Sequence, residues 1–177
     1  YESEKTSNES ALPHNPAISY SLSFDGTDDY AQIANNVSFS SFADAMTVSA
    51  WVKVTGGENT HRTIISKAGA APQSFTLTVS ETNHFRPHVY NDLGWTYFDA
   101  GNTVQDDVWY HVAFTYGLNE SNNTWLVLFV NGALVGFNGS VNGDIVNNSN
   151  DLHIGAYFDG SSYSNYFVGQ IDEVCIW

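Results

Sequence analysis

From Ile18 to the C-terminus the sequence is a succession of short runs rich in β-branched and aromatic residues, separated by clusters of Gly, Asn, Asp and Ser. The run at residues 46–54, MTVSAWVKV, is apolar at every second position, and Thr47, Ser49 and Lys53 fall between the apolar residues. A period of two residues is that of a β-strand with one buried face. The pattern predicts an antiparallel all-β fold built from many short strands.

About twelve runs have this strand character. They lie at residues 19–24, 29–34, 46–54, 62–67, 74–80, 84–90, 95–99, 108–116, 124–130, 133–137, 151–158 and 167–177. Asn131-Gly132 separates two of them and predicts a type I′ hairpin, because both central positions of that turn need positive φ. Only residues 38–45 are compatible with a short 3₁₀ or α turn. Irregular loop lengths favour two stacked sheets, a β-sandwich, over a closed barrel.

The composition of the chain limits the kinds of molecule that it can bind. The chain of 177 residues is 42% hydrophobic with four prolines, which predicts one folded domain. Its formal charge of -14 disfavours nucleic acid and anionic membrane surfaces, whereas it is compatible with divalent cations or simply with solubility. A single cysteine, Cys175, excludes a disulfide within the chain. No apolar run approaches the roughly 18 residues of a membrane span.

The two ends of the sequence predict a module tethered to other domains of a larger chain. Residues 1–17 are polar, hold two of the four prolines and show no periodicity, so we expect a linker or N-terminal arm, with the domain itself at residues 18–177. The sequence begins at Tyr1 without Met or a signal peptide and stops at Trp177 within an apolar run.

Four segments carry a family resemblance: SLSFDGTDDYAQI at 21–33, MTVSAWVKV at 46–54, residues 109–136, and FVGQIDEVCIW at 167–177. Together they resemble the laminin-G-like, pentraxin-like jelly rolls of the concanavalin A-like lectin and glucanase superfamily. The resemblance implies an extracellular jelly roll whose first strand lies beside its last. Members include carbohydrate-binding modules, adhesin domains, lectins, hydrolases and lyases, so the fold does not choose among them.

The resemblance also implies a calcium site at the junction of the first and last strands. Asp25 and Asp28 flank a tight turn, and Asp172 lies on the last strand. Calcium takes six to eight oxygen ligands, and carboxylates with turn carbonyls supply them. We expect a structural calcium held by these three residues. In the alternative, Asp25 and Asp28 make turn hydrogen bonds, and Asp172 faces solvent or a backbone amide.

The strands at residues 84–99 are the first candidate ligand site. His84, Arg86, His88 and Tyr90 alternate with apolar residues and share a face that is too polar for a core. Sugar recognition combines an aromatic plane with planar polar groups. The predicted ligand-binding residues are therefore Arg86, His88, Asn91, Trp95, Tyr97 and Asp99. The alternative is an ordinary solvated sheet face with aromatics packing across strands.

The loop at residues 157–167 is the second candidate. It mixes aromatic rings with small polar residues, a composition typical of adaptable recognition loops. We expect Tyr163 and Tyr166 to be exposed ligand contacts, and Asp159 to bind a second calcium that bridges to a ligand. Alternatively the rings complete the core. Cys175 alternates with Val174 and Ile176, which predicts a packed thiol.

The sequence favours binding over catalysis. The nearest match to the paired carboxylates of glycoside hydrolases is Gln170-Ile171-Asp172-Glu173, which lacks a leading Glu and places its two acids on opposite faces. HFRPHVYN holds the Arg, His and Tyr of a lyase without surrounding motifs. We predict a non-catalytic extracellular module that binds carbohydrate with calcium, within a larger adhesin or polysaccharide-degrading protein. The alternatives are a module that binds a cell-surface or matrix glycoprotein, a structural spacer, and a polysaccharide lyase or hydrolase.

Overall fold

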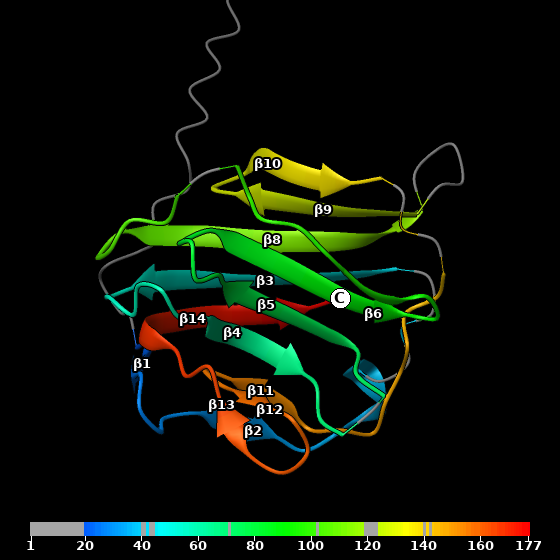
Figure 1. Ribbon diagram of the computed structural model, residues 1–177, viewed down its shortest axis with the longest axis horizontal. Helices are drawn as coiled ribbons and strands as arrows, with labels where there is room; N and C mark the ends of the chain where they lie inside the picture. The colour runs from blue at the N-terminus through cyan, green and yellow to red at the C-terminus, as the bar shows by residue number, and fades with distance from the viewer. Residues whose placement is uncertain are drawn as a thin grey trace, which may run out of the picture.

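Two antiparallel sheets of six strands each are stacked to form a β-sandwich, as the sequence predicts (Figure 1). The computed structural model describes residues 20–39, 42, 45–70, 72–101, 103–118, 124–139, 141 and 143–177. The predicted arm at residues 1–17 lies outside this part of the chain. None of the helical segments described has the length and apolarity that crossing a bilayer requires.

Sheet A has the strand order β1-β14-β3-β8-β9-β10, and sheet B the order β2-β11-β4-β5-β6-β7. The strands of sheet A are β1 (Leu22–Asp25), β14 (Val168–Ile176), β3 (Met46–Val54), β8 (Trp109–Leu118), β9 (Thr124–Val130) and β10 (Ala133–Asn138). Those of sheet B are β2 (Ala31–Ile33), β11 (Leu152–Ile154), β4 (Arg62–Lys67), β5 (Phe75–Val79), β6 (Phe85–Asn91) and β7 (Gly94–Tyr97). A hairpin of β12 (Tyr157–Phe158) and β13 (Tyr163–Ser164) and a 3₁₀ turn at Val37–Phe39 complete the described elements.

Several local predictions are confirmed. β3 and β4 have the predicted bounds, and β1 pairs with β14. Asn131 and Gly132 join β9 to β10 with φ of 51° and 77°, the conformation that favours Asn-Gly at a hairpin turn. The 3₁₀ turn starts one residue before the range predicted for it, and residues 40, 41, 43 and 44 of that range lie outside the described part.

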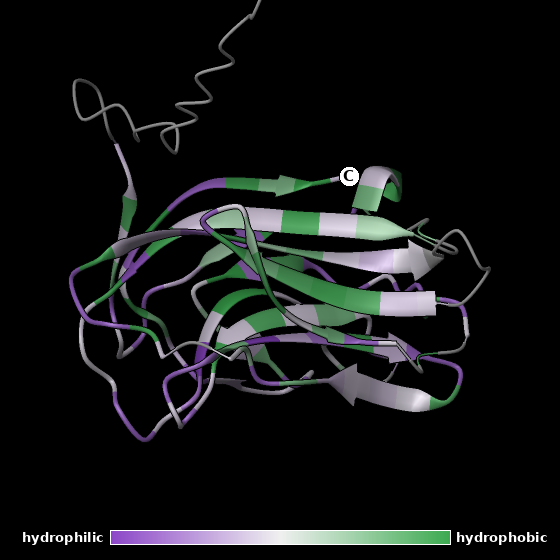
Figure 2. Cartoon of the chain, turned by 90° about the horizontal axis from the view of Figure 1, so that it is seen from above, coloured by the Kyte–Doolittle hydropathy of each residue, from purple (hydrophilic) through white to green (hydrophobic). Residues whose placement is uncertain are grey.

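The core lies between the sheets and follows the alternation of the strands. Bands of high and low hydropathy succeed one another along several strands (Figure 2). Val48, Val52 and Val54 of β3 are fully buried, and they meet residues such as Phe75 and Leu77 of β5 within one apolar cluster. Full burial of each such side chain stabilises the fold by roughly 1.5–3 kcal/mol.

The predicted strand at residues 151–158 is interrupted. β11 ends at Ile154, and Gly155 has φ of 87°, a left-handed conformation that strand residues avoid. A Cβ at Gly155 would overlap the ring of Phe24, so only glycine fits here. The chain leaves sheet B at this point and forms the β12–β13 hairpin. After the hairpin the chain comes back beside Gly155, where the amide of Phe167 donates a hydrogen bond to the Gly155 carbonyl.

The prediction of a packed Cys175 is wrong, because Cys175 is exposed. The β14–β3 ladder has a register shift between Asp172 and Cys175, and Glu173 takes a φ of 46°. Such a bulge inserts one residue and reverses the alternation beyond it. Val174 and Ile176 consequently pack against the core, and Cys175 faces outward between them.

Candidate ligand-binding groove

The outer face of sheet B brings polar and aromatic side chains from three neighbouring strands together. Across the β5–β6 ladder Thr76 lies opposite His88, and Thr78 lies opposite Arg86. His88 in turn lies opposite Tyr97 of β7. Phe85, Pro87 and Val89 alternate with these residues and are buried on the inner side, which leaves Arg86 and His88 on the outer face, as the sequence predicts.

A groove with a volume of about 310 Å³ lies over this face. Its lining residues are His61, Thr76, Thr78, Arg86, His88, Trp95, Tyr97, Tyr157 and Asn165. Tyr157 and Asn165 come from the segment that contains the β12–β13 hairpin, so the two segments predicted to bind ligand meet across one groove. Its volume is at the lower end of the range of small-molecule sites, which is about 300–1,000 Å³.

Two aromatic side chains on β7 remain accessible. Trp95 is 36% exposed and Tyr97 is 52% exposed. The centroid of the Tyr97 ring lies 5.0 Å from that of the His88 ring. The Arg86 guanidinium lies over the Tyr97 ring, 5.5 Å from its centroid. Trp95 meets His88 and Tyr90 edge to face, with centroids 5.6 Å and 5.2 Å apart. Neighbouring rings and one cation therefore hold both side chains in place before any ligand arrives.

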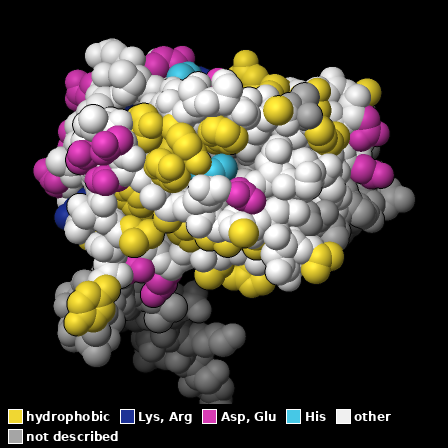
Figure 3. All heavy atoms as spheres, turned by 90° about the horizontal axis from the view of Figure 1, so that it is seen from below, with side chains coloured by type: hydrophobic (Ala, Val, Ile, Leu, Met, Phe, Trp, Pro, Cys, Tyr) yellow, Lys and Arg dark blue, Asp and Glu magenta, His cyan; other side chains and the backbone are white. Residues whose placement is uncertain are grey.

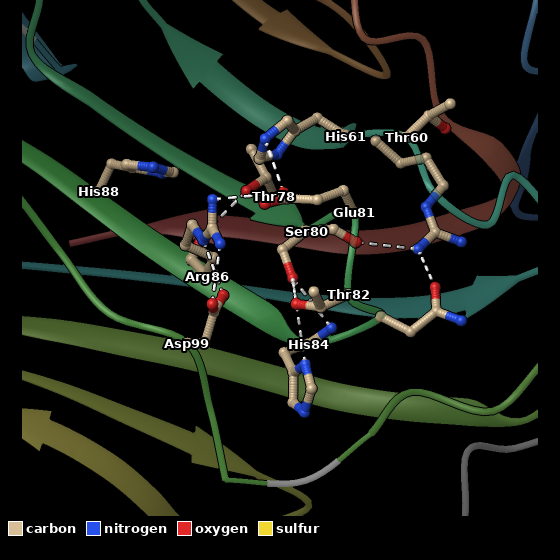
Figure 4. A network of polar contacts seen from close by, with 12 residues as sticks. Thr60, His61, Thr78, Ser80, Glu81, Thr82, His84, Arg86, His88 and Asp99 are labelled. Atoms are coloured by element: carbon tan, nitrogen blue, oxygen red, sulfur yellow. Dashed lines mark hydrogen bonds and ion pairs between the residues drawn. The ribbon is translucent and has the colours of Figure 1, made fainter.

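Arg86 is the centre of a charged network at one end of the groove (Figure 4). Its Nε and one Nη donate to the two oxygens of Asp99 at 2.7 Å and 2.8 Å, and the other Nη lies 3.5 Å from Glu81. His61 Nε2 lies 2.8 Å from the same Glu81 carboxylate. The hydrogen bonds between Arg86 and Asp99 raise the pKa of the guanidinium and lower the pKa of the carboxyl.

His88 lies apart from that network and is neutral. Burial, with a smaller contribution from the nearby Arg86 charge, lowers its pKa to about 4. Its Nδ1 lies 3.0 Å from the hydroxyl of Thr76. At neutral pH the ring therefore presents an uncharged, hydrogen-bonding imidazole to the groove.

Asn91, one of the predicted ligand contacts, requires a correction. It is 2% exposed and belongs to the buried side of β6. Its Nδ2 donates to the hydroxyl of Tyr116 at 3.4 Å, and its Oδ1 accepts from the amide of Leu93 at 3.0 Å. Asn91 thus shapes the β6–β7 turn from within and is not accessible to a ligand.

Asp159, Tyr163 and Tyr166 do not line the groove. Asp159 accepts from the amides of Ser161 and Ser162, both at 2.8 Å, and these bonds lower its pKa to about 2. The Asp159 carboxylate thus stabilises the turn of the β12–β13 hairpin, and its predicted role in a second calcium site remains a prediction.

Tyr163 belongs to an aromatic cluster at the β2 edge of sheet B. It stacks on Tyr30 with centroids 4.0 Å apart, and its hydroxyl lies 3.3 Å from Nε2 of His153. Burial is the largest cause that raises the pKa of Tyr163 to about 12. Figure 3 shows hydrophobic side chains, tyrosines included, gathered around a histidine on the face seen from below. Tyr163 and Tyr166 are both half-buried, and neither belongs to the apolar core that the alternative interpretation implies.

The predicted metal ligands are brought together only in part. Carboxylate oxygens of Asp25, Asp28 and Asp29 lie within 4.8 Å of one another, and all three residues are exposed. Asp25 also accepts from the amide of Thr27 at 2.7 Å, which is the turn hydrogen bond of the alternative interpretation. The prediction that Asp172 joins them is not supported by the ladder. Asp25 lies opposite Val168, so Asp172 is four residues, roughly 13 Å, further along β14.

Sequence reasoning missed five residues of the groove. Thr76 and Thr78 were detectable, because they alternate with the apolar residues of SFTLTVS and so had to share the outer face. Tyr157 and Asn165 belong to the loop at residues 157–167, which was predicted as a candidate site, but they were not named as ligand contacts, and His61 gave no local signal. They reach the groove through tertiary contacts, such as the hydrogen bond from the amide of Thr63 to the Asn165 carbonyl at 2.8 Å.

Comparisons with known proteins give one family and a common fold. The family model described as the concanavalin A-like lectin/glucanases superfamily matches residues 25–177. No protein of curated function matches the sequence. Among solved structures, the chain is similar to the Ruminococcus gnavus IT-sialidase CBM40 bound to alpha2,3 sialyllactose, with 16% identity over 85% of this chain and 89% of that one and a TM-score of 0.63.

Two further structures have the same fold. Domains LG4-5 of the mouse laminin alpha1 chain align at 14% identity over 88% of this chain and 40% of theirs, with a TM-score of 0.67. Domain 4 of AbnA, an extracellular arabinanase from Geobacillus stearothermophilus, in complex with arabinotriose, aligns at 16% identity over 88% of this chain and 69% of that one, with a TM-score of 0.57. At such identities the likeness shows the fold alone.

Proposed function

The chain belongs to the concanavalin A-like lectin/glucanases superfamily, and on this premise we propose that it is a non-catalytic module that binds carbohydrate in the groove of sheet B. The observation that carries the proposal is the pairing of two accessible aromatic rings, Trp95 and Tyr97, with a fixed set of polar groups in one depression. Aromatic faces pack on the C–H face of a sugar ring, and polar groups bond its hydroxyls.

The ligands of similar structures support a sugar as the ligand. A carbohydrate-binding module with this fold binds sialyllactose, and an arabinanase domain with this fold binds arabinotriose. The first is a module of a sialidase and the second is domain 4 of an extracellular arabinanase. We therefore propose that this module acts outside the cell, attached to further domains of an adhesin or a polysaccharide-degrading protein.

The geometry of the groove favours binding over hydrolysis. Glycoside hydrolases need one carboxyl group as an acid and a second as a nucleophile or base, about 5–10 Å apart. Among the described residues, those that line the groove include no Asp or Glu. The neighbouring Asp99 holds both of its oxygens against Arg86 and has a lowered pKa, so it is a poor proton donor at neutral pH.

A structural calcium remains a proposal of its own. The carboxylates of Asp25, Asp28 and Asp29 form a donor set suited to a hard cation, at a turn that leads from β1. Thermal melts in calcium and in chelator would test it. Calcium binding there raises the melting temperature of the wild-type protein and not that of Asp28→Asn, and identical melts in both buffers would remove the site.

A glycan array followed by titration calorimetry tests the carbohydrate proposal. Binding of the best array glycan should fall about 5- to 150-fold on Trp95→Ala or Tyr97→Ala, if stacking of a sugar on an aromatic ring contributes about 1–3 kcal/mol, as stacking of a nucleic-acid base does. Trp177→Ala and Tyr20→Ala are matched controls, since these rings are 64% and 92% exposed and belong to the ends of the described chain. A blank array would instead favour the protein-binding or spacer alternatives.

A further inference from the structure

We infer that the groove selects uncharged glycans and discriminates against sugars that carry a carboxylate or sulfate, because Arg86, the one Lys or Arg among the described residues that line it, is already bound by carboxylates of the protein itself. The inference rests on the proposed function and specifies its ligand class. It concerns the charge of the ligand, which neither the fold nor the similar structures determine.

Four Lys and Arg residues belong to the described part of the chain. Of the Lys and Arg residues in the described part, Arg62 and Lys67 are fully buried. Both are held by uncharged oxygens: Arg62 donates to the carbonyls of Gly56 and Ser80, and Lys67 donates to the Asn150 carbonyl at 2.7 Å. Lys53 lies on sheet A, 5.6 Å from the centre of the Trp109 ring. Arg86 is therefore the cation of the groove.

The guanidinium of Arg86 has no free pair of parallel N–H donors. Recognition of a ligand carboxylate by arginine uses two parallel N–H donors. In Arg86 the Nε and Nη pair is bound to both oxygens of Asp99, and the remaining Nη faces Glu81. The Arg86 side chain is only 12% exposed. An anionic sugar would have to displace Asp99 and leave that carboxylate unpaired.

Two histidines, His61 and His88, also line the groove. His61 is bound to Glu81, so its ring also faces a carboxylate of the protein. His88 is neutral at pH 7, since its pKa lies at about 4. The carboxylates of Glu81 and Asp99 both lie within ion-pair distance of Arg86. Two carboxylates thus offset one arginine, and the whole chain carries a formal charge of -14. This field repels an anionic ligand as it approaches.

An uncharged glycan meets none of these costs. Its hydroxyls can exchange hydrogen bonds with Thr76, Thr78 and Asn165, which line the groove. Its C–H faces can lie against Trp95 or Tyr97. The Arg86–Asp99 pair then acts as a positioning unit that fixes the Tyr97 ring and need not open.

The test uses glycan pairs in which methyl esterification removes the charge of the carboxylates: oligogalacturonates against their methyl esters, and sialyllactose against its methyl ester. Calorimetry with the wild-type protein should give binding of the uncharged member of at least one pair, and at least about tenfold weaker binding of its acidic partner. Asp99→Asn removes the carboxylate that is bound to Arg86. It should therefore reduce the difference in affinity between the uncharged glycan and its acidic partner. Asp172→Asn, on sheet A, changes the net charge equally and should leave the difference as it is. A cooperative thermal melt of Asp99→Asn establishes that it is folded.

The possible results separate the two proposals. Acidic glycans that bind as tightly as their neutral partners, with binding abolished by Trp95→Ala, would overturn the charge inference and leave the glycan-binding function standing. Equal narrowing by Asp99→Asn and Asp172→Asn would overturn the role of the Arg86–Asp99 pair. If no glycan binds in a manner sensitive to Trp95→Ala, the proposed function fails and the inference falls with it.

Discussion

Protonation of His88 should destabilise the fold by an amount that the structure allows to be calculated. The folded pKa of about 4 lies below the ordinary value of 6.5, so between these two values the unfolded chain binds a proton that the folded chain does not. Stability attributable to His88 is therefore intact above pH 6.5 and decreases as the pH falls toward 4. At about 1.4 kcal/mol per pH unit, the loss reaches about 3 kcal/mol by pH 4.

Urea unfolding of the wild-type protein and of His88→Gln, each at pH 7 and pH 4, measures this contribution. Gln keeps an uncharged hydrogen-bonding side chain beside Thr76 and cannot gain a proton. The wild-type protein should lose about 3 kcal/mol more than His88→Gln between the two pH values, with the largest part below pH 6. NMR titration of the His88 ring gives its pKa independently. Parallel losses in the two proteins, or a His88 ring that titrates near 6.5, would refute the reasoning.

Three further predictions concern the scaffold. Leu128→Ala should cost about 2–5 kcal/mol in chemical denaturation because Leu128 is fully buried, whereas Leu134→Ala, at a position 57% exposed, should cost less than about 1 kcal/mol; equal losses would contradict the assigned core. Gly169→Ala should destabilise by roughly 3 kcal/mol or prevent folding, since Gly169 has φ of 129° and a Cβ there would overlap the Lys53 carbonyl; a wild-type melting temperature would be inconsistent with this strand packing. Cys175, exposed beyond the β14 bulge, should react with a thiol reagent in the native protein within minutes and with one equivalent, and protection until denaturant is added would indicate the packed thiol.

The fold was predictable from sequence where local pattern and tertiary environment agree. β3 alternates strictly, and its predicted bounds match the observed Met46–Val54. The hairpin at Asn131-Gly132 follows from the φ values that this pair tolerates. In both cases the neighbouring residues alone determine the structure.

The failures occur where a single residue changes the backbone path. Gly155 ends β11 because Phe24, far away in the sequence, occupies the space that a side chain would need. The bulge at Glu173 reverses the alternation of β14 and exposes Cys175. The periodicity of the sequence indicates neither the end of β11 nor the bulge in β14, because both depend on contacts with a neighbouring strand or ring.

The strands of the candidate site and the loop opposite them were each predicted, but not that they meet across one groove. Arg86, His88, Trp95 and Tyr97 lie together as the alternation of the two strands implies. Their partners across the groove belong to another part of the chain. The ion pair that occupies Arg86 could not be predicted either, because Asp99 lies beyond the end of β7, where alternation no longer fixes the direction of a side chain.

The most direct test of glycan binding in this groove is an NMR titration of the protein with the best uncharged array glycan. Shifts are predicted for the indole N–H of Trp95, the ring of Tyr97 and the amides of Thr76 to His88, with saturation at one equivalent. The resonances around Asp25 and Tyr163 should stay unchanged. Shifts confined to the Asp25–Asp29 turn or to the Tyr30–Tyr163 cluster, with none at Trp95, would place the binding site elsewhere and contradict the account.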